Sequence, residues 1–309
     1  MSAFADDETI DLLRKHYVSV APSLTEELKA RDAGGDFFRT VVNQRAEPKH
    51  SKQGYYICSP DGTLLKGWMY PRPDDGTMKR FLKETLQSYH PPTEVPALDG
   101  SKVDRNANPL PPEGGLVVEV YSKIIDAKWQ PTNLERFQII RGNIGRDRFW
   151  LLKTEVQELL KGVLPDSLLE RMIRFHLIDT TRGVAGAWQR GDIKAVQIKL
   201  SPESGKVHLE GSVRIEEAGN RRYDAKVYGT LETKGNAVTR FDVLVRGAHS
   251  ATKPDVGEAP VGTSTLAVAF ALAGSGETSR VPPLYSWQLG EYLRTTNLRV
   301  TELRGQVKE

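Results

Sequence analysis

The sequence predicts an α+β protein built from two modules that a proline-rich linker joins. Its 309 residues are about twice the commonest domain length. Six prolines fall between positions 91 and 112. Helical and strand patterns alternate before this stretch, whereas short strands of alternating polarity dominate after it. We therefore expect an α/β module over residues 1–90, a linker over 91–114, and an antiparallel β-rich module (a meander or half-barrel) with a few helices over 115–309.

The charge balance and the single cysteine exclude several classes of protein. Forty-three basic and forty acidic side chains leave a net charge of +3, which is too small a surplus to indicate nucleic acid. No apolar run approaches the roughly 20 residues of a membrane helix, so we expect no membrane span. Cys58 is the sole cysteine, which rules out an internal disulfide, a Cys-x-x-Cys pair and a cysteine-built zinc site. No motif indicates a cofactor.

The start of the chain bears on location. Its first eight residues lack the basic and apolar segments of a signal peptide. We expect the cytoplasm for the chain as it stands, and the periplasm or secretion if an N-terminal segment is missing.

The first module alternates helices and strands. Asp6 or Asp7 can cap a helix, because a carboxylate suits a helix N-terminus and the basic residues 14–16 suit its end. Pro60 and Gly62 fit a turn between two apolar runs, which predicts a β-hairpin. The expected elements are, in order, a helix to residue 16, a strand at 17–20, a polar helical region that Gly34-Gly35 interrupts before it resumes to 42, hairpin strands at 54–58 and 63–70, and a helix that Asp75 caps and that ends near Tyr89.

The prolines define the linker. Proline has no amide hydrogen and favours an extended backbone, so residues 91–114 are not expected to pair into a sheet or to build a core. We expect proteases to cut here and to release two folded pieces.

The second module reads as a series of antiparallel strands. Over 207–215, odd positions are apolar or glycine and even positions are polar, which is typical of a strand with one wet face. Turns at 217–220 and 233–236 join neighbours, so residues 193–246 are expected to form a meander. The expected strands are 116–125, 137–141, 148–152, 193–200, 207–215, 223–231, 238–245 and 266–273, with helices at 155–161, 166–172 and 286–294.

The apolar side of this sheet must be covered in one of two ways. If helices cover it, the interior is core. If the sheet curls, a cavity remains that suits a small apolar or amphipathic ligand. In that case we expect Trp150, Trp188 and Tyr228 at its mouth. Core packing explains the same aromatic residues equally well.

Two stretches of the first module form a recognisable pattern: Phe4-Ala-Asp6 leading through Leu12-Leu13 to Tyr17–Val20, and the hairpin over 55–65 with the helix after it. On these stretches, residues 3–90 resemble the thioredoxin-fold superfamily. The resemblance implies a thioredoxin-like module without the first strand and the Cys-x-x-Cys helix, because that motif would fall before Met1. The family's cis-proline is not evident at Gln53-Gly54. The fold is thus implied without the redox activity.

The second module contains Trp188 near 190–192, and the expected strands at 223–229 and 239–243. With these features the whole chain also resembles bacterial two-part proteins of planctomycete type, in which a thioredoxin-like module precedes a β-rich one. It implies no activity.

The chemically interesting residues are few. Cys58 is a candidate for single-cysteine redox chemistry, but it ends a predicted strand, whereas a reactive thiolate needs an electropositive helix start. No two histidines have the spacing of metal ligands on one helix or strand. A metal site assembled from distant residues would use His176, Asp179, His208 and His249, although a solvated histidine is the commoner interpretation of His208 on its polar strand face.

These observations favour a non-enzymatic binding or interaction protein. Its first module would be a redox-inactive docking unit, and its second would bind an unidentified protein or a small apolar ligand. The alternative is a thioredoxin-like oxidoreductase whose active cysteines lie upstream of this chain, or one that uses Cys58 alone.

Overall fold

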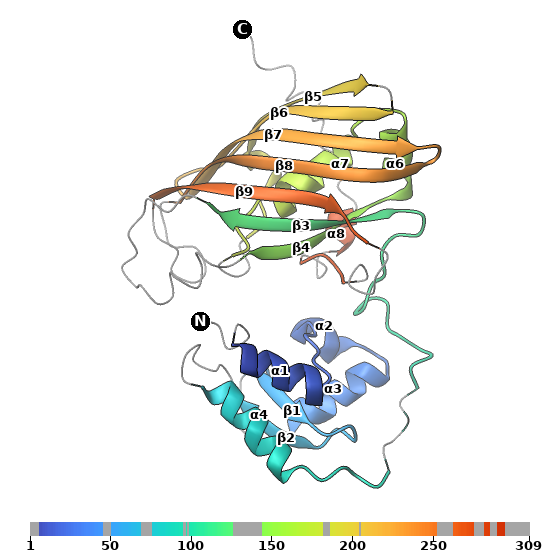
Figure 1. Cartoon of the computed structure of the whole chain (residues 1–309), viewed down its shortest axis with the longest axis vertical. Coiled ribbons are helices and arrows are strands. Elements are labelled where there is room, and N and C mark those ends of the chain that lie inside the picture. The colour runs from blue at the N-terminus through green and yellow to red at the C-terminus, as the bar shows by residue number, and fades with distance from the viewer. Residues whose placement is uncertain are drawn as a thin grey trace. The chain divides into compact units, whose positions relative to one another are not determined.

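The computed structural model describes residues 6–45, 51–68, 76–94, 97, 99–125, 144–181, 186–203, 205–251, 262–274, 281–284 and 289–293 (Figure 1). The chain divides into two compact units, residues 1–109 and 110–309. The division falls within the proline-rich segment. The predicted strand at 137–141 and the predicted cap Asp75 lie outside the described residues.

The first unit is a small α/β arrangement around one hairpin. Strands β1 and β2 pair antiparallel, with Tyr55 opposite Trp68. Ile57, Met78 and Leu82 form a small buried core between the hairpin and the helices. The described elements are α1 (Asp7–His16), α2 (Leu24–Lys29), α3 (Ala33–Asn43), β1 (Tyr55–Cys58), β2 (Leu64–Trp68) and α4 (Thr77–Ser88).

Local chemistry accounts for the ends of these elements. The Asp6 side chain accepts a hydrogen bond from the Thr9 amide at 2.9 Å and so caps α1, as the sequence predicts. Gly62 has φ +86°, which is a conformation that glycine adopts without strain in the hairpin turn. The hairpin and the final helix of this unit are confirmed. A thioredoxin-like fold stays a prediction.

Two expectations for the first unit are wrong. Residues 17–20 form no strand, because none of the described strands lies beside them to complete the hydrogen bonds; Val18 is 93% and Val20 79% exposed. Gly34-Gly35 does not interrupt the helix, since α3 begins at Ala33 and runs through both glycines. A Cβ on Gly35 would lie 2.5 Å from the Ala30 carbonyl oxygen, so this glycine serves close packing.

Part of the proline-rich segment is fixed to the first unit. The Asp104 amide donates to the Asp32 carboxylate at 2.6 Å, and the Arg31 amide donates to the Asp104 carboxylate at 3.0 Å. Asn108 also donates to the Glu27 carboxylate at 3.2 Å. Residues 104–108 are therefore an ordered strap against the start of α3, and are not a free linker.

The second unit is one seven-stranded antiparallel sheet with short helices on one face (Figure 1). The strand order is β4-β3-β9-β8-β7-β6-β5, so the predicted meander is confirmed and the last strand pairs with the first. The elements are β3 (Leu116–Ile124), β4 (Gly145–Leu151), α6 (Lys153–Leu160), α7 (Asp166–Arg171), the π-helical η2 (Met172–His176), the short 3-10 turn η3 (Arg190–Asp192), β5 (Ile193–Glu203), β6 (Lys206–Glu217), β7 (Arg221–Lys234), β8 (Ala237–Ala251), β9 (Gly262–Leu272) and α8 (Leu289–Leu293).

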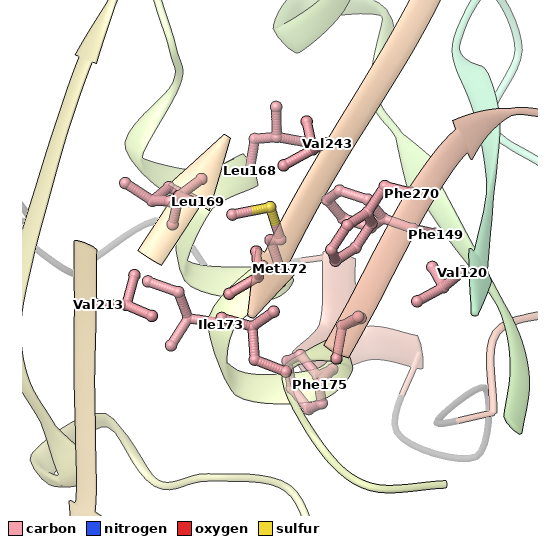
Figure 2. Packing of buried hydrophobic residues seen from close by; sticks show 14 of the residues in the cluster. Val120, Phe149, Leu168, Leu169, Met172, Ile173, Phe175, Val213, Val243 and Phe270 are labelled. Carbon is pink, nitrogen blue, oxygen red and sulfur yellow. The ribbon is translucent and has the colours of Figure 1, made fainter. Parts of the chain in front are cut away.

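The helices cover the apolar side of the sheet. Leu168, Leu169, Met172 and Ile173 of α7 and η2 pack among inward side chains of the strands, including Phe270 (Figure 2). The alternation seen in the sequence sets which side faces them, because Leu209, Val213 and Ile215 of β6 are buried while His208, Glu210 and Arg214 are exposed. The inner face of the sheet is thus consumed by core, which is the first of the two arrangements considered above.

Two glycines of the sheet lie where neighbouring strands approach closely. A Cβ on Gly211 would lie 1.8 Å from the Gln197 carbonyl oxygen, and one on Gly247 would lie 1.9 Å from the Asp224 carbonyl oxygen. Neighbouring strands therefore approach so closely on the inner side that only glycine fits.

Among the helices that the structure describes, none is long and apolar enough to cross a membrane.

Candidate functional site

The three aromatic residues predicted for a pocket separate in the structure. Trp150 and Trp188 are completely buried in the hydrophobic core. Tyr228 stands on the opposite, outer face of the sheet and is 50% exposed. The inner tryptophans are therefore packing residues, and Tyr228 alone is placed to meet a ligand.

The four candidate metal ligands do not converge. His176 and His249 are buried, His208 is exposed beside Glu203 at 3.2 Å, and Asp179 accepts hydrogen bonds from Thr181. The described part of the chain holds no group of three residues that could bind a metal ion.

Cys58 is placed as the sequence predicts, at the end of β1 before the turn. Burial raises the pKa of its thiol, and the nearby Asp61 carboxylate raises it further. A raised pKa leaves less thiolate at neutral pH, and thiolate is the reactive form. The surroundings of Cys58 thus disfavour redox chemistry.

A buried polar cluster lies at the edge strand β4. Arg171 makes two hydrogen bonds to the Glu155 carboxylate, one of 2.8 Å, and a third of 3.1 Å to the Trp150 carbonyl oxygen. Glu155 also accepts from the Leu152 amide at 2.8 Å and from Ser167 at 2.6 Å. The fork of the guanidinium matches the carboxylate, and these contacts satisfy backbone groups that an edge strand leaves open.

His176 and Tyr292 continue this cluster. The Tyr292 hydroxyl lies 2.8 Å from His176 Nε2 and accepts a hydrogen bond from the Trp150 amide at 3.3 Å. His176 Nδ1 lies 2.9 Å from the Asp147 carboxylate, although the two are not aligned for a hydrogen bond. Burial raises the pKa of Tyr292 well above its usual range. An Asp–His–Tyr series can relay protons, but all three side chains are buried, so here it secures α8 and η2 against β4.

The outer face of the sheet carries an open pocket of about 500 Å³. Tyr228 of β7 borders it, with polar side chains from β5, β6 and β7 around it. The lining residues are Gln197, Ile198, Lys199, Glu210, Gly211, Ser212, Lys226 and Tyr228. Strand pairing places Tyr228 opposite Glu210 and Leu244, and Leu244 is 40% exposed.

Charges on this outer face are sorted into two kinds. Towards its ends four cations contact carboxylates: Glu232 lies 3.2 Å from both Lys206 and Arg240, and Asp224 lies within 4 Å of Arg222 and Arg214. The middle is different. Lys226 and Arg246 stand directly opposite each other on β7 and β8, both are exposed, and neither has an ion pair with a carboxylate among the described residues.

The row that contains this pair holds no acid. Across the sheet it runs Gln197, Ser212, Lys226, Arg246, Ala267 and Lys123. We name the pocket with Lys226, Arg246, Tyr228 and Leu244 the outer-face site. Its cations could not be found from the sequence, because their juxtaposition depends on the register of β7 with β8; the alternation that places Lys226 on the wet face was the available signal.

Comparisons of the chain with protein-family models, with curated proteins and with solved structures found no match.

Proposed function

We propose that this chain is a non-enzymatic binding protein and that its ligand occupies the outer-face site of the second unit. The observation that carries the proposal is the half-exposed Tyr228 at an open pocket on a face that no described helix covers. Ligand sites combine an aromatic or apolar surface with a few polar groups that orient the ligand. Ser212, Gln197 and the lysines supply those groups.

The first unit is proposed to be a redox-inactive, thioredoxin-like docking unit. Two observations support this: a hairpin followed by a helix, and a single cysteine whose pKa is raised. One thiol does not form an intramolecular disulfide. We expect reduction of insulin disulfides by this chain to equal that of its Cys58→Ser variant, and turnover above that variant would contradict this part of the proposal.

A fragment screen tests the site. Neutral and charged aromatic fragments are added to the full-length protein, and amide shifts are followed by NMR. Binding should move the signals of Ser212, Lys226 and Tyr228 and should weaken in Tyr228→Ala. A matched control is Tyr121→Ala, because Tyr121 lies on the same face three strands away. Fragments that bind only elsewhere, or with no loss in Tyr228→Ala, would refute the proposed site.

A further inference from the structure

We propose that the outer-face site takes a small anionic ligand with a planar or apolar part, the anionic group lying between Lys226 and Arg246 and the planar part against Tyr228. This inference rests on the proposed function and names its ligand class. The occupant is a small organic anion, such as an aromatic carboxylate, sulfonate or phosphate ester.

The charge arrangement is the first step. Like charges directly opposite on neighbouring strands destabilise a sheet. Lys206, Arg214, Arg222 and Arg240 have carboxylate partners, but Lys226 and Arg246 face each other across β7 and β8. Their row contains only neutral residues and a third cation, Lys123. An anion at this position would relieve the repulsion.

The neighbours of the pair orient the ligand. Tyr228 lies two residues along β7 from Lys226, which places both side chains on the same face. Leu244, opposite Tyr228, extends the apolar surface. Glu210 stands between Lys199 and Tyr228 in the next row. Its carboxylate repels an anion there, so the anionic group is directed to Lys226 and Arg246.

The size of the pocket limits the ligand. About 500 Å³ lies within the range of small-molecule sites. Lys123 is two strands from Arg246 in the sheet order, which is roughly 10 Å. A small ligand at the pocket therefore leaves Lys123 free, whereas an extended polyanion crossing the sheet would use it.

Two dyes with nearly the same rings provide the test. 1-Anilinonaphthalene-8-sulfonate carries a sulfonate, and N-phenyl-1-naphthylamine lacks it. Each is titrated into the full-length protein and followed by fluorescence. We expect at least about tenfold tighter binding of the sulfonate dye in 50 mM salt, and a loss of most of that advantage in 500 mM salt, because salt screens exposed charges.

Three variants locate the interaction. The double variant Lys226→Ala/Arg246→Ala should weaken the sulfonate dye about tenfold and leave the neutral dye unchanged. Lys123→Ala, the matched control, should change either affinity less than twofold. The thermal unfolding temperature of the double variant should be unchanged or slightly higher than that of the unaltered protein, since a repulsive pair is removed. Retained stability separates loss of binding from loss of fold.

The outcomes distinguish this inference from the proposed function. Equal affinity for both dyes, with both lost in Tyr228→Ala, would overturn the anionic inference and keep the proposed site. If neither dye shows binding that depends on Tyr228, both the anionic inference and the proposed site would be overturned. Weakening of the sulfonate dye by Lys123→Ala equal to that in the double variant would overturn the inference, because it would show that the anionic group is not held specifically between Lys226 and Arg246.

Discussion

The pair of Arg171 and Glu155 shows at the level of single residues what secures the second unit. Both side chains are buried, and they share hydrogen bonds with the backbone of the edge strand. Removing one member of such a pair leaves an uncompensated buried charge. Each member of the pair therefore stabilises the second unit only while the other member is present.

We expect Arg171→Met to lower the free energy of unfolding by about 3–5 kcal/mol, as measured by urea denaturation. The double variant Arg171→Met/Glu155→Met should lose less than the sum of the two single variants, because no unpaired charge remains. Lys206→Met is the control, since it breaks an exposed ion pair and should cost less than about 1 kcal/mol. A loss for Arg171→Met as small as that of Lys206→Met would show that the pair contributes little.

Cys58 gives a second prediction about a single residue. Because its pKa is raised, the thiol should react with iodoacetamide more slowly at pH 7.5 than a cysteine in a short peptide, and its rate should continue to rise at higher pH than the peptide's. Mass spectrometry of the alkylated protein over pH 6–10 measures both. Addition of urea should remove the difference, because unfolding abolishes the burial that raises the pKa. Folded protein that reacts as fast as the peptide at pH 7.5 would contradict the prediction.

At the level of elements, the stability of the sheet depends on how closely its strands approach each other. Gly211→Ala should lower the free energy of unfolding by about 1–3 kcal/mol, because its Cβ would overlap the backbone of β5. Gly191→Ala is the control, since a Cβ added there would have no atom within 4 Å, and it should change stability by less than about 0.5 kcal/mol. Equal stability of the two variants would mean that β5 and β6 separate without cost.

The strap at 104–108 gives a prediction for another element. Asp32 accepts hydrogen bonds from the Gly35 and Asp104 amides, and these hold the pKa of its carboxyl below the usual value. Asp32→Ala removes both a helix cap and the strap's anchor, so trypsin should cut after Arg105 about five times faster. Asp36→Ala, also in the first turn of α3, should have little effect on that cut.

Lowering the pH should loosen the strap, as Asp32→Ala does. A depressed pKa contributes stability that is present above the unfolded value and is lost as the pH falls through the folded value. Exchange of the Asp104 amide hydrogen should therefore speed up, relative to the intrinsic rate, below the usual carboxyl range. An unchanged protection factor there would contradict the role of Asp32.

At the level of the whole molecule, the sequence predicted individual strands and helices better than it predicted which strands pair with each other. The alternation over 207–215 was enough to assign β6 and its buried face, because each strand residue alternates sides. Residues 17–20 have the same apolar character but form no strand, since pairing depends on a neighbour that local composition does not reveal. The outer-face site was missed for a related reason: Lys226 and Arg246 meet only through the register of two strands.

The strand order has a consequence for how the chain is made. β3 and β4 leave the ribosome before the other strands of this sheet, but the partner on the other side of β3 is β9. Ile124 pairs with Leu266, 142 positions later. At roughly 5–20 residues per second, the ribosome delivers that partner on the order of ten seconds after β3 has appeared. During this interval the edge of β3 that later pairs with β9 exposes unpaired backbone groups, and a strand of another chain can pair with them. Synthesis of β9 closes the sheet, so the second unit can become resistant to aggregation only after residue 272 has left the ribosome.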